Sequence, residues 1–523
     1  MFIIVQASET NTCIFHDLTK LEKLKNLKEK VNWKIEKERH ELLGQLYPLV
    51  REWTSELPNL RDIFRPKEIE LLLSDALNCR HASQCSGERF RFGSEFIDFV
   101  VRSGYKDQPE VDKNGKISSR RTTPIHHAVD EGWVTLGKKL FGIYDRYDVN
   151  YTDETTGYTH FHAACASGPS DVVEKFLDLG QDIDIRTREG DSPLHLALEY
   201  VEKDIAELLL RRGADPNSTN AEGSTPLHFI CELEFREDLA EMLFEICDEK
   251  HQVVRVDARD ECGRTPLQYA VATIGPNVID VLLDRGADLS SFVFPTESLF
   301  DECLVELKFC KFLLASGLLA TVDRLVRRGY ELDRGEAATI MKIFAKCECF
   351  DKSTDDLDER WYDDEEFRSK AKELTIKPNL SLDDLIRLRL EEAAKLVTYT
   401  DYFDFAKNGT HTLGLEEQHA EPCLLHLCEK LSRGFFRSWA LYPFWELIHY
   451  RLPLECCEMV LANLNNEDLY HIYLAATEKY ENNPNPTSRS SSRVQHESLR
   501  SAELGFDVEI RSVELNNFEG RTQ

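Results

Sequence analysis

The chain has 523 residues, enough for two to four domains, and its 94 acidic against 64 basic side chains give a formal net charge of −30. Such a charge repels nucleic-acid backbones and anionic membranes, and no apolar run approaches the about 18 residues that a membrane-spanning helix needs. The 15 cysteines form no C-x-x-C pair, which argues against a disulfide framework or a structural zinc site. We therefore expect an intracellular protein, in the cytoplasm or the nucleus, with no nucleic-acid or membrane partner.

Residues 1–92 are predicted to form a helical, non-repetitive cap. Apolar residues recur there at spacings of three and four, with Lys and Glu between them, as in an amphipathic helix. A coiled-coil seam is an alternative, but the pattern lasts less than three heptads and favours a packed cap. The apolar positions are Leu18, Leu21, Leu24, Leu27, Val31 and Ile35.

Five near-copies of one hexapeptide follow at intervals of 36, 33, 33 and 40 residues. Thr or Ser at the first position can cap a helix, and Pro at the second suits the first helical turn. The third position is a larger apolar residue and the sixth is mostly Ala, and these two positions share one helical face. We expect the His at the fourth position to bond the neighbouring backbone rather than to perform chemistry. The copies are TPIHHA at 123–128, THFHAA at 159–164, SPLHLA at 192–197, TPLHFI at 225–230 and TPLQYA at 265–270.

A second signal lies downstream of the hexapeptides, where an apolar helix ends at a glycine. The clearest copies are LLLRRGADPN at 208–217 and VLLDRGAD at 281–288, and FLDLG at 176–180 is looser. Glycine takes the left-handed conformation of a helix C-cap without steric cost. The polar stretches that follow are predicted to be projecting turns, at 181–190, 214–223 and 256–263.

A period near 33 residues with this hexapeptide closely resembles the ankyrin repeat. The match is clear from 123 to 287. More weakly, 96–104 reads as the second helix of an incomplete leading repeat and 321–332 as the end of a trailing one. The resemblance implies an all-α solenoid of helix pairs with projecting turns, which we place at 93–333. The interval of 40 predicts an insertion in a connecting loop at 249–255.

Residues 334–420 are predicted to be a helical linker region. Its acidic run at 355–366 is expected to be a solvated face or loop, and a helix is expected over 381–397 with Ser381 as its N-cap. The polar segment 482–523 has few apolar residues and is predicted to be a disordered tail.

Residues 421–481 carry the second informative pattern, LPLECCEMVLANLNNEDL at 452–469. Pro opens a short apolar helix, on which Cys456, Met459, Val460 and Leu464 fall at helical spacing. Asn465 or Asn466 is then expected to cap a second short helix. This segment resembles the opening of an F-box. Behind ankyrin repeats it is similar to the PRANC domain, which implies docking on the Skp-type adaptor of a cullin ubiquitin ligase. The alternative is a plain helical cap without a partner.

These resemblances imply an adaptor that binds a target protein and brings it to a ubiquitin ligase. Leu452, Pro453, Met459 and Leu464 would contact the Skp-type adaptor or pack the module's own core. Tyr200 is expected on the concave side of the repeats, where an aromatic ring could anchor a partner. The candidate target-binding residues on the turns are Asp153, Glu154, Arg186, Arg188, Asn220, Glu222, Arg259 and Asp260.

No pattern assembles a nucleophile, a base and an oxyanion donor, so we expect no enzyme, no catalytic residue, no metal and no cofactor. Residues 132–139 come near the phosphate-binding loop pattern, but Lys139 stands where that loop needs a hydroxyl. The rival interpretation is a passive ankyrin scaffold or inhibitor without a ligase link.

Overall fold

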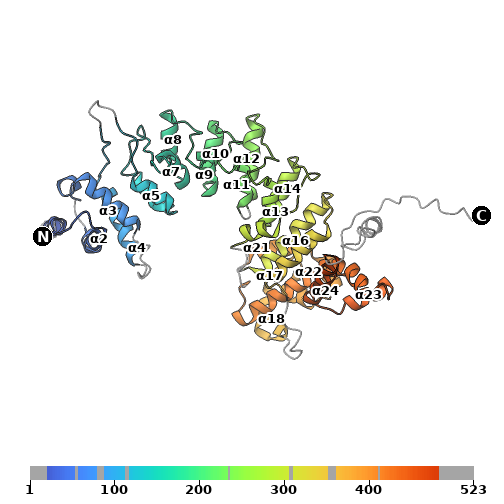
Figure 1. The fold of residues 1–523 in the computed structure, drawn as a ribbon. Helices are drawn as coiled ribbons and strands as arrows, with labels where there is room; N and C mark the ends of the chain where they lie inside the picture. The colour runs from blue at the N-terminus through green and yellow to red at the C-terminus, as the bar shows by residue number, and fades with distance from the viewer. Residues whose placement is uncertain are drawn as a thin grey trace, which may run out of the picture. The chain divides into compact units, whose positions relative to one another are not determined.

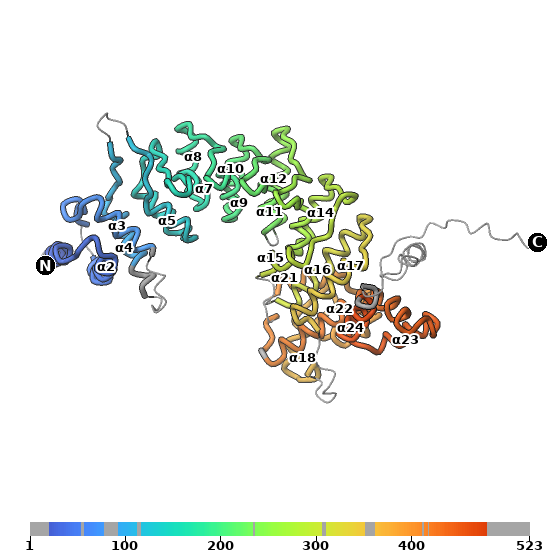
Figure 2. Tube along the Cα trace, viewed as in Figure 1, coloured from blue at the N-terminus to red at the C-terminus, as the bar shows by residue number. Residues whose placement is uncertain are grey.

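The computed structural model describes residues 20–53, 57–78, 88–111, 117–233, 236–305, 310–350, 361–409 and 413–481. Helices dominate these residues, which confirms the all-α prediction. The only strands among them are β1 (Thr375–Lys377) and β2 (Leu380–Ser381), a short antiparallel hairpin. The chain forms two compact units, residues 1–266 and 267–523 (Figures 1 and 2). This division falls inside the fifth predicted repeat, whereas the sequence placed a boundary at 333.

The predicted N-terminal helix is shorter than its apolar pattern. Residues 20–29 are helical and Leu24 is buried, but residues 30–35 form turns and Ile35 is 43% exposed. The Asn32 side chain accepts a hydrogen bond from Lys34 N–H at 3.2 Å, and such a local bond competes with helix continuation. Leu18 lies outside the described residues. The next elements are α2 (Glu36–Arg51), the 3-10 turn η1 (Leu60–Asp62), α3 (Pro66–Asn78) and α4 (Glu88–Arg102).

The helix pair α3–α4 takes the place of a leading repeat. Helix α3 contacts α4 and the first helix of the next pair, and α4 contacts the second helix of that pair. Gly104 follows α4 with φ +72°, as expected for the end of a repeat. The predicted boundary at residue 92 therefore lies inside α4, and the repeat partner α3 was not assigned from the sequence.

Each hexapeptide opens the inner helix of a helix pair, as predicted. Inner helices α5, α7, α9 and α11 stack in succession, and α10 contacts both α8 and α12 (Figure 1). Helix α13 begins at the division between the two units. The pairs are α5 (Pro124–Asp130) with α6 (Val134–Leu140), α7 (His160–Ser167) with α8 (Ser170–Asp178), α9 (Pro193–Glu199) with α10 (Lys203–Arg212), α11 (Pro226–Glu232) with α12 (Glu237–Glu249), and α13 (Pro266–Ala272) with α14 (Pro276–Asp284).

The third hexapeptide residue supplies the core between stacked helices. Its side chain is fully buried at Ile125, Phe161, Leu194 and Leu227. Burying one such side chain contributes about 1.5–3 kcal/mol. The repetition of one buried position in consecutive pairs is what gives the solenoid its continuous core.

The extra residues of the longest interval are divided between a helix and the loop predicted at 249–255. Outer helix α12 has 13 residues, against 9 in α8 and 10 in α10. The segment from α12 to the next hexapeptide is also longer, at 250–264 compared with 213–224 after α10. The extra turn of α12 buries Phe244, Ile246 and Cys247, and this apolar burial favours helix over loop.

Unit 2 continues the helix pairs beyond the last hexapeptide. The Thr296 hydroxyl accepts a hydrogen bond from Leu299 N–H at 3.4 Å and so caps α15. Gly329 follows α16 with φ +94°, at the end of the predicted trailing repeat. These helices are α15 (Glu297–Cys303) and α16 (Lys311–Arg327).

The region predicted as a linker is folded. Helix α17 contacts α22 and α24, α20 contacts α22, and α21 contacts α16. Ser381 caps α19 as expected, but the predicted helix 381–397 breaks after Arg387. Residues 355–360 of the acidic run lie outside the described residues. The elements are α17 (Arg334–Lys346), the 3-10 turn η4 (Trp361–Asp363), α18 (Glu365–Glu373), α19 (Leu382–Arg387), α20 (Leu390–Leu396) and α21 (Tyr399–Asn408).

The C-terminal helices are α22 (Glu417–Leu447), α23 (Leu454–Leu461) and α24 (Asn466–Glu481), and α22 contacts both others. Asn465 caps α24, since its side-chain oxygen accepts from Asp468 N–H at 2.7 Å. Helix α24 has 16 residues and is not the short helix that was expected. The predicted tail at 482–523 lies outside the described residues. None of the described helices combines the length and apolar character that crossing a bilayer requires.

Candidate functional site

The hexapeptide histidines join neighbouring repeats. Ser192 N–H donates to His195 Nδ1 at 3.1 Å, and His195 Nε2 lies 3.2 Å from the Ser224 carbonyl oxygen in the next repeat. Because Nδ1 accepts, the proton belongs on Nε2, and the neutral ring fits both partners. The same pair of contacts recurs at His126, His162 and His228. The predicted structural role of these histidines is confirmed.

Burial in this arrangement keeps the rings neutral. It lowers the pKa of His126, His162 and His195 to about 4, although carbonyl contacts on the Nε2 side oppose the shift. These histidines are therefore not available as acid–base groups near neutral pH.

Three of the predicted turn-tip residues are held inside their turns. Asp153 is only 4% exposed and accepts hydrogen bonds from Thr156 N–H at 2.8 Å and from the Thr122 hydroxyl. Burial alone would raise the pKa of Asp153, but these bonds outweigh it and hold the pKa well below its usual range. The expectation of a projecting side chain is corrected for Asp153, because Asp and Asn side chains close turns by bonding their own backbone.

Asp260 and Asn220 close the later turns in the same way. Asp260 is 9% exposed and accepts from Arg264 N–H at 2.7 Å. The Asn220 side-chain oxygen accepts from Ser224 N–H at 2.9 Å, and its amide donates to Asp191 at 3.0 Å. These contacts place Asp260 and Asn220 within the framework of the turns.

The other predicted tip residues, Glu154, Arg186, Arg188, Glu222 and Arg259, are exposed. Arg186 and Arg259 each donate to the carbonyl of the glycine that closes their own turn, at 3.1 and 2.8 Å. Glu154, Arg188 and Glu222 have no side-chain hydrogen bond or ion pair within the described part of the chain. Their side chains are accessible to a partner, and their role in binding stays a prediction.

Tyr200 lies across the ends of the inner helices. It is half-buried directly after α9, and its hydroxyl donates to the Val129 carbonyl oxygen in α5 at 3.3 Å. Burial raises the pKa of Tyr200, and the nearby Glu199 and Asp130 carboxylates add to the rise. The ring therefore spans two repeats on the side where the inner helices end.

Three carboxylates on the same side were missed by the sequence reasoning. Asp130, Glu199 and Glu232 are the last residues of α5, α9 and α11, and all three are exposed. Burial raises the pKa of each carboxylate, and that of Glu232 reaches about 7, with Glu222 as the next cause. The signal that could have found them is their register, since each stands seven residues after the capping Thr or Ser.

The C-terminal module presents apolar side chains to solvent. On α23, Cys457 and Leu461 face the core, whereas Met459 is 70% exposed. Leu452 is 41% exposed, and its carbonyl accepts from Trp445 Nε1 at 2.8 Å. Of the four predicted adaptor-binding residues, Leu452, Pro453 and Met459 are exposed and Leu464 is half-buried.

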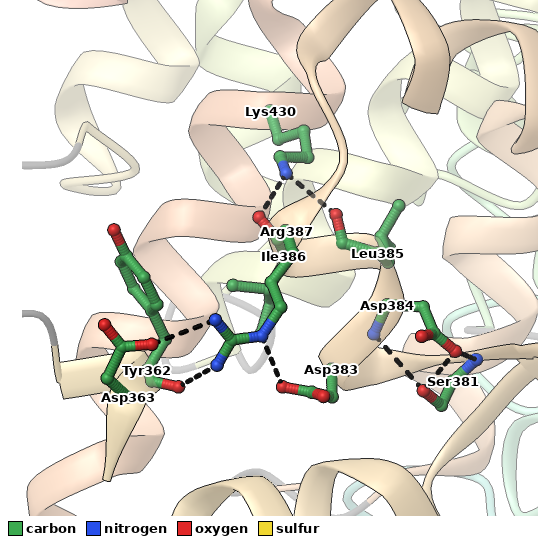
Figure 3. Close-up of polar contacts among 9 residues, drawn as sticks. All are labelled: Tyr362, Asp363, Ser381, Asp383, Asp384, Leu385, Ile386, Arg387 and Lys430. Carbon is green, nitrogen blue, oxygen red and sulfur yellow. Dashed lines mark hydrogen bonds and ion pairs between the residues drawn. The ribbon is translucent and has the colours of Figure 1, made fainter.

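A buried lysine joins this module to the region before it. Lys430 of α22 donates to the carbonyl oxygens of Leu385 and Ile386 at 2.8 and 2.7 Å (Figure 3). It also donates to the carbonyl oxygen of Leu388 at 2.9 Å. These carbonyls lie where α19 ends and the helical ladder stops supplying N–H donors, although Leu385 also accepts from Leu388 N–H at 3.3 Å. Arg387 also binds Asp383 at 2.9 Å and thereby fixes the same turn.

One cluster has the composition of a metal site. The ligand atoms of Glu36, His40 and Asp75 lie within 4.8 Å of one another, the only such group of three among the described residues. The Arg39 guanidinium binds both oxygens of Asp75, one of them at 2.9 Å. This cation repels a metal ion and engages the best ligand, so we interpret the cluster as an ion-pair network between α2 and α3.

A hollow of about 410 Å³ is lined by polar side chains, including Glu70, Arg121 and His127. Arg121 is engaged by Glu70 at 2.8 Å and by Asp107 at 3.2 Å, and it braces the segment that leads into α5.

The comparison with protein families agrees with this architecture. A family model described as ankyrin repeats, in three copies, matches residues 125–220 and 194–292. The chain thus contains ankyrin repeats, which are binding repeats and not a catalytic family. The comparison with curated proteins gives no match.

Proposed function

We propose that this chain, whose ankyrin repeats give it a protein-interaction role, is an adaptor for ubiquitin ligation. The repeats bind a target protein, and helices α22–α24 dock on the Skp-type adaptor of a cullin ubiquitin ligase. The chain then supplies proximity, while the recruited enzymes carry out the covalent transfer. Such an adaptor works in the cytoplasm or the nucleus and uses neither a cofactor nor a nucleic-acid or membrane partner.

The exposed apolar side chains before α23 and near its C-terminal end support the ligase link. Single exposed apolar residues are ordinary on protein surfaces, but clusters of them mark interaction sites. Eleven large hydrophobic residues are exposed among the described ones, and four of these fall within residues 450–460. They are Tyr450, Leu452, Met459 and Val460.

Co-purification with a Skp-type adaptor tests the proposal. We expect the full chain to retain the adaptor, and the double variant Leu452→Asp with Met459→Asp to lose it, because two charges would have to be desolvated in an apolar contact. Both side chains are exposed, so the variant should remain folded. Leu179→Asp with Val253→Asp is the matched control, since these residues are 60% and 81% exposed in the repeats.

A passive scaffold or inhibitor is the second candidate function. The buried network around Lys430 favours it, because a C-terminal module fastened to its neighbours can serve as a cap alone. Adaptor recovery that is absent, or equal in the α23 variant and its control, would support the scaffold.

A further inference from the structure

Acidic side chains stand on both the outer and the inner helices of the repeats. Several of those on the outer helices have ion-pair partners, among them Asp171 with Lys175 at 2.9 Å and Glu207 with Arg211 at 2.9 Å, whereas Glu174, Asp204, Glu241 and Glu245 have none among the described residues. Glu249 also pairs with Arg211, at 2.7 Å. By contrast, Asp130, Glu199 and Glu232 at the inner-helix ends have no ion pair or side-chain hydrogen bond among the described residues. On the outer helices, Asp178 also pairs with Arg212 and Asp238 with Lys203.

Aromatic rings lie between these free carboxylates. Tyr158 and Tyr200 are half-buried, and the Tyr158 ring packs against His162 of α7 with ring centroids 5.4 Å apart. Burial raises the pKa of Tyr158, and Glu199 of the following repeat and Asp130 of the preceding one add to the rise. Phe229 is also half-buried, and it packs edge-on against His195 with ring centroids 5.1 Å apart. The carboxylates end α5, α9 and α11, while Tyr158 precedes α7, Tyr200 directly follows α9 and Phe229 lies in the middle of α11. We call this set of carboxylates and rings on the inner helices the acidic–aromatic row. Its members are Asp130, Tyr158, Glu199, Tyr200, Phe229 and Glu232.

Opposing charge near the row is limited. Arg264 acts on Glu232 and lowers its pKa, but Glu222 and Asp260 raise it more strongly. The Arg186 guanidinium donates hydrogen bonds to the carbonyl oxygens of Gly190 and Thr219 and does not pair with a carboxylate of the row. The three carboxylates of the row thus have no ion-pair partner among the described residues, and Arg264 offsets only part of the negative charge around Glu232.

We propose that the acidic–aromatic row binds an extended, basic segment of the target protein. This inference rests on the proposed function, in which the repeats bind a target. Lys or Arg head groups pair with Asp130, Glu199 and Glu232, and their aliphatic stems or guanidinium planes lie on the tyrosine rings. Charge complementarity of this kind selects a partner more than it adds affinity.

The stacking of repeats also sets the spacing of the basic residues. Stacked helices lie about 8–10 Å apart, and an extended chain advances about 3.3 Å per residue. Glu232 and Glu199 belong to adjacent repeats, so their partners should be about three residues apart. Asp130 lies two repeats beyond Glu199, so its partner should be about six residues further along.

The test uses the full chain and a fluorescent peptide of about twelve residues with lysines at this spacing. We expect the variant Glu199→Gln with Glu232→Gln to bind the peptide about tenfold more weakly than the wild type, with a weaker dependence on salt. The control variant Glu207→Gln with Glu249→Gln removes the same net charge from outer-helix ion pairs and should bind as the wild type does. A second peptide with the same lysines placed side by side should bind less tightly.

Equal loss in both variants would mean that only the overall charge attracts the peptide and would overturn the proposal, as would the absence of peptide binding. The adaptor co-purification, repeated with Glu199→Gln and Glu232→Gln, separates the two proposals. Peptide binding without adaptor recovery would refute the ligase link and leave the row standing. If the wild type and the variant with Glu199→Gln and Glu232→Gln capture a target protein equally well, the proposed role of the row is wrong, whereas the binding function of the repeats is supported.

Discussion

At the scale of single residues, the hexapeptide histidine joins two repeats only as a neutral ring. The Nδ1 atom accepts a bond from the capping residue, so a proton there would face an N–H donor. The fifth hexapeptide carries Gln268 instead, and its Nε2 donates to the Val293 carbonyl at 2.9 Å. Glutamine can thus replace the contact of the histidine Nε2 atom with a carbonyl further along the chain, and it does so without titrating.

This comparison predicts an acid-sensitive solenoid. In the unfolded chain the histidines titrate near pH 6.5, whereas in the folded state the pKa of His126, His162 and His195 is about 4. Their stabilising contribution is complete above about pH 6.5 and is lost as the pH falls towards about 4, by up to about 3 kcal/mol per histidine. Urea unfolding of unit 1 at pH 7 and at pH 5 measures the difference.

The variant His195→Gln should flatten this pH dependence and reduce stability at pH 7 by only about 1 kcal/mol, because the bond to Ser224 can be retained. An unchanged slope between pH 7 and pH 5 would show that the acid sensitivity has another source.

At the scale of elements, the projecting turns stack closely. Gly190 has φ +81°, and a Cβ there would lie 2.7 Å from Ala221 N in the next turn. Gly180 has nearly the same φ, +82°, but a Cβ there meets nothing within 4 Å. The two glycines therefore separate the cost of a left-handed backbone from the cost of a steric clash.

We expect Gly180→Ala to destabilise unit 1 by about 1 kcal/mol through backbone strain alone. Gly190→Ala should cost about 2–4 kcal/mol, because the clash with rigid backbone adds to that strain. Denaturant midpoints of the two variants measure the difference, and equal costs would mean that the turns can move apart freely.

The break between α19 and α20 depends on one buried cation. Lys430 is 8% exposed, and burial lowers its pKa to about 8 while three carbonyls hold its ammonium group. We expect Lys430→Met to destabilise unit 2 by about 2–3 kcal/mol, since the carbonyls lose a charged donor. Hydrogen exchange of residues 382–396 should rise, whereas the exposed control Lys395→Met should leave it unchanged.

At the scale of the whole molecule, each of the two compact units contains fully buried apolar side chains. Leu227 is fully buried in unit 1 and Phe436 is fully buried in unit 2. We expect Leu227→Ala to cost unit 1 about 2–5 kcal/mol and Phe436→Ala to cost unit 2 about 3–5 kcal/mol. Hydrogen exchange at increasing urea should show each loss only in the unit that carries the change. A loss shared by both units would indicate a single cooperative transition.

The sequence by itself determined the repeats, because one supersecondary unit repeated at a fixed period needs the same cap, proline and buried residue each time. Ser192, Leu194 and His195 illustrate this: their roles follow from local backbone bonding and helical periodicity. The cap at Ser381 was predictable for the same local reason.

Only the tertiary structure decided which side chains remain free. Asp153 and Glu154 are neighbours with the same charge, and only Glu154 remains accessible. The Asp153 carboxylate accepts hydrogen bonds from threonines that include Thr122, 31 residues away. The folding of the supposed linker likewise depends on Lys430, which lies more than forty residues from the carbonyls that it caps. Long-range contacts of this kind leave no period in the sequence, because each involves a single pair of positions. The carboxylates of the acidic–aromatic row could be identified only in the stacked repeats, where their lack of ion-pair partners can be compared with the ion pairs of the outer helices.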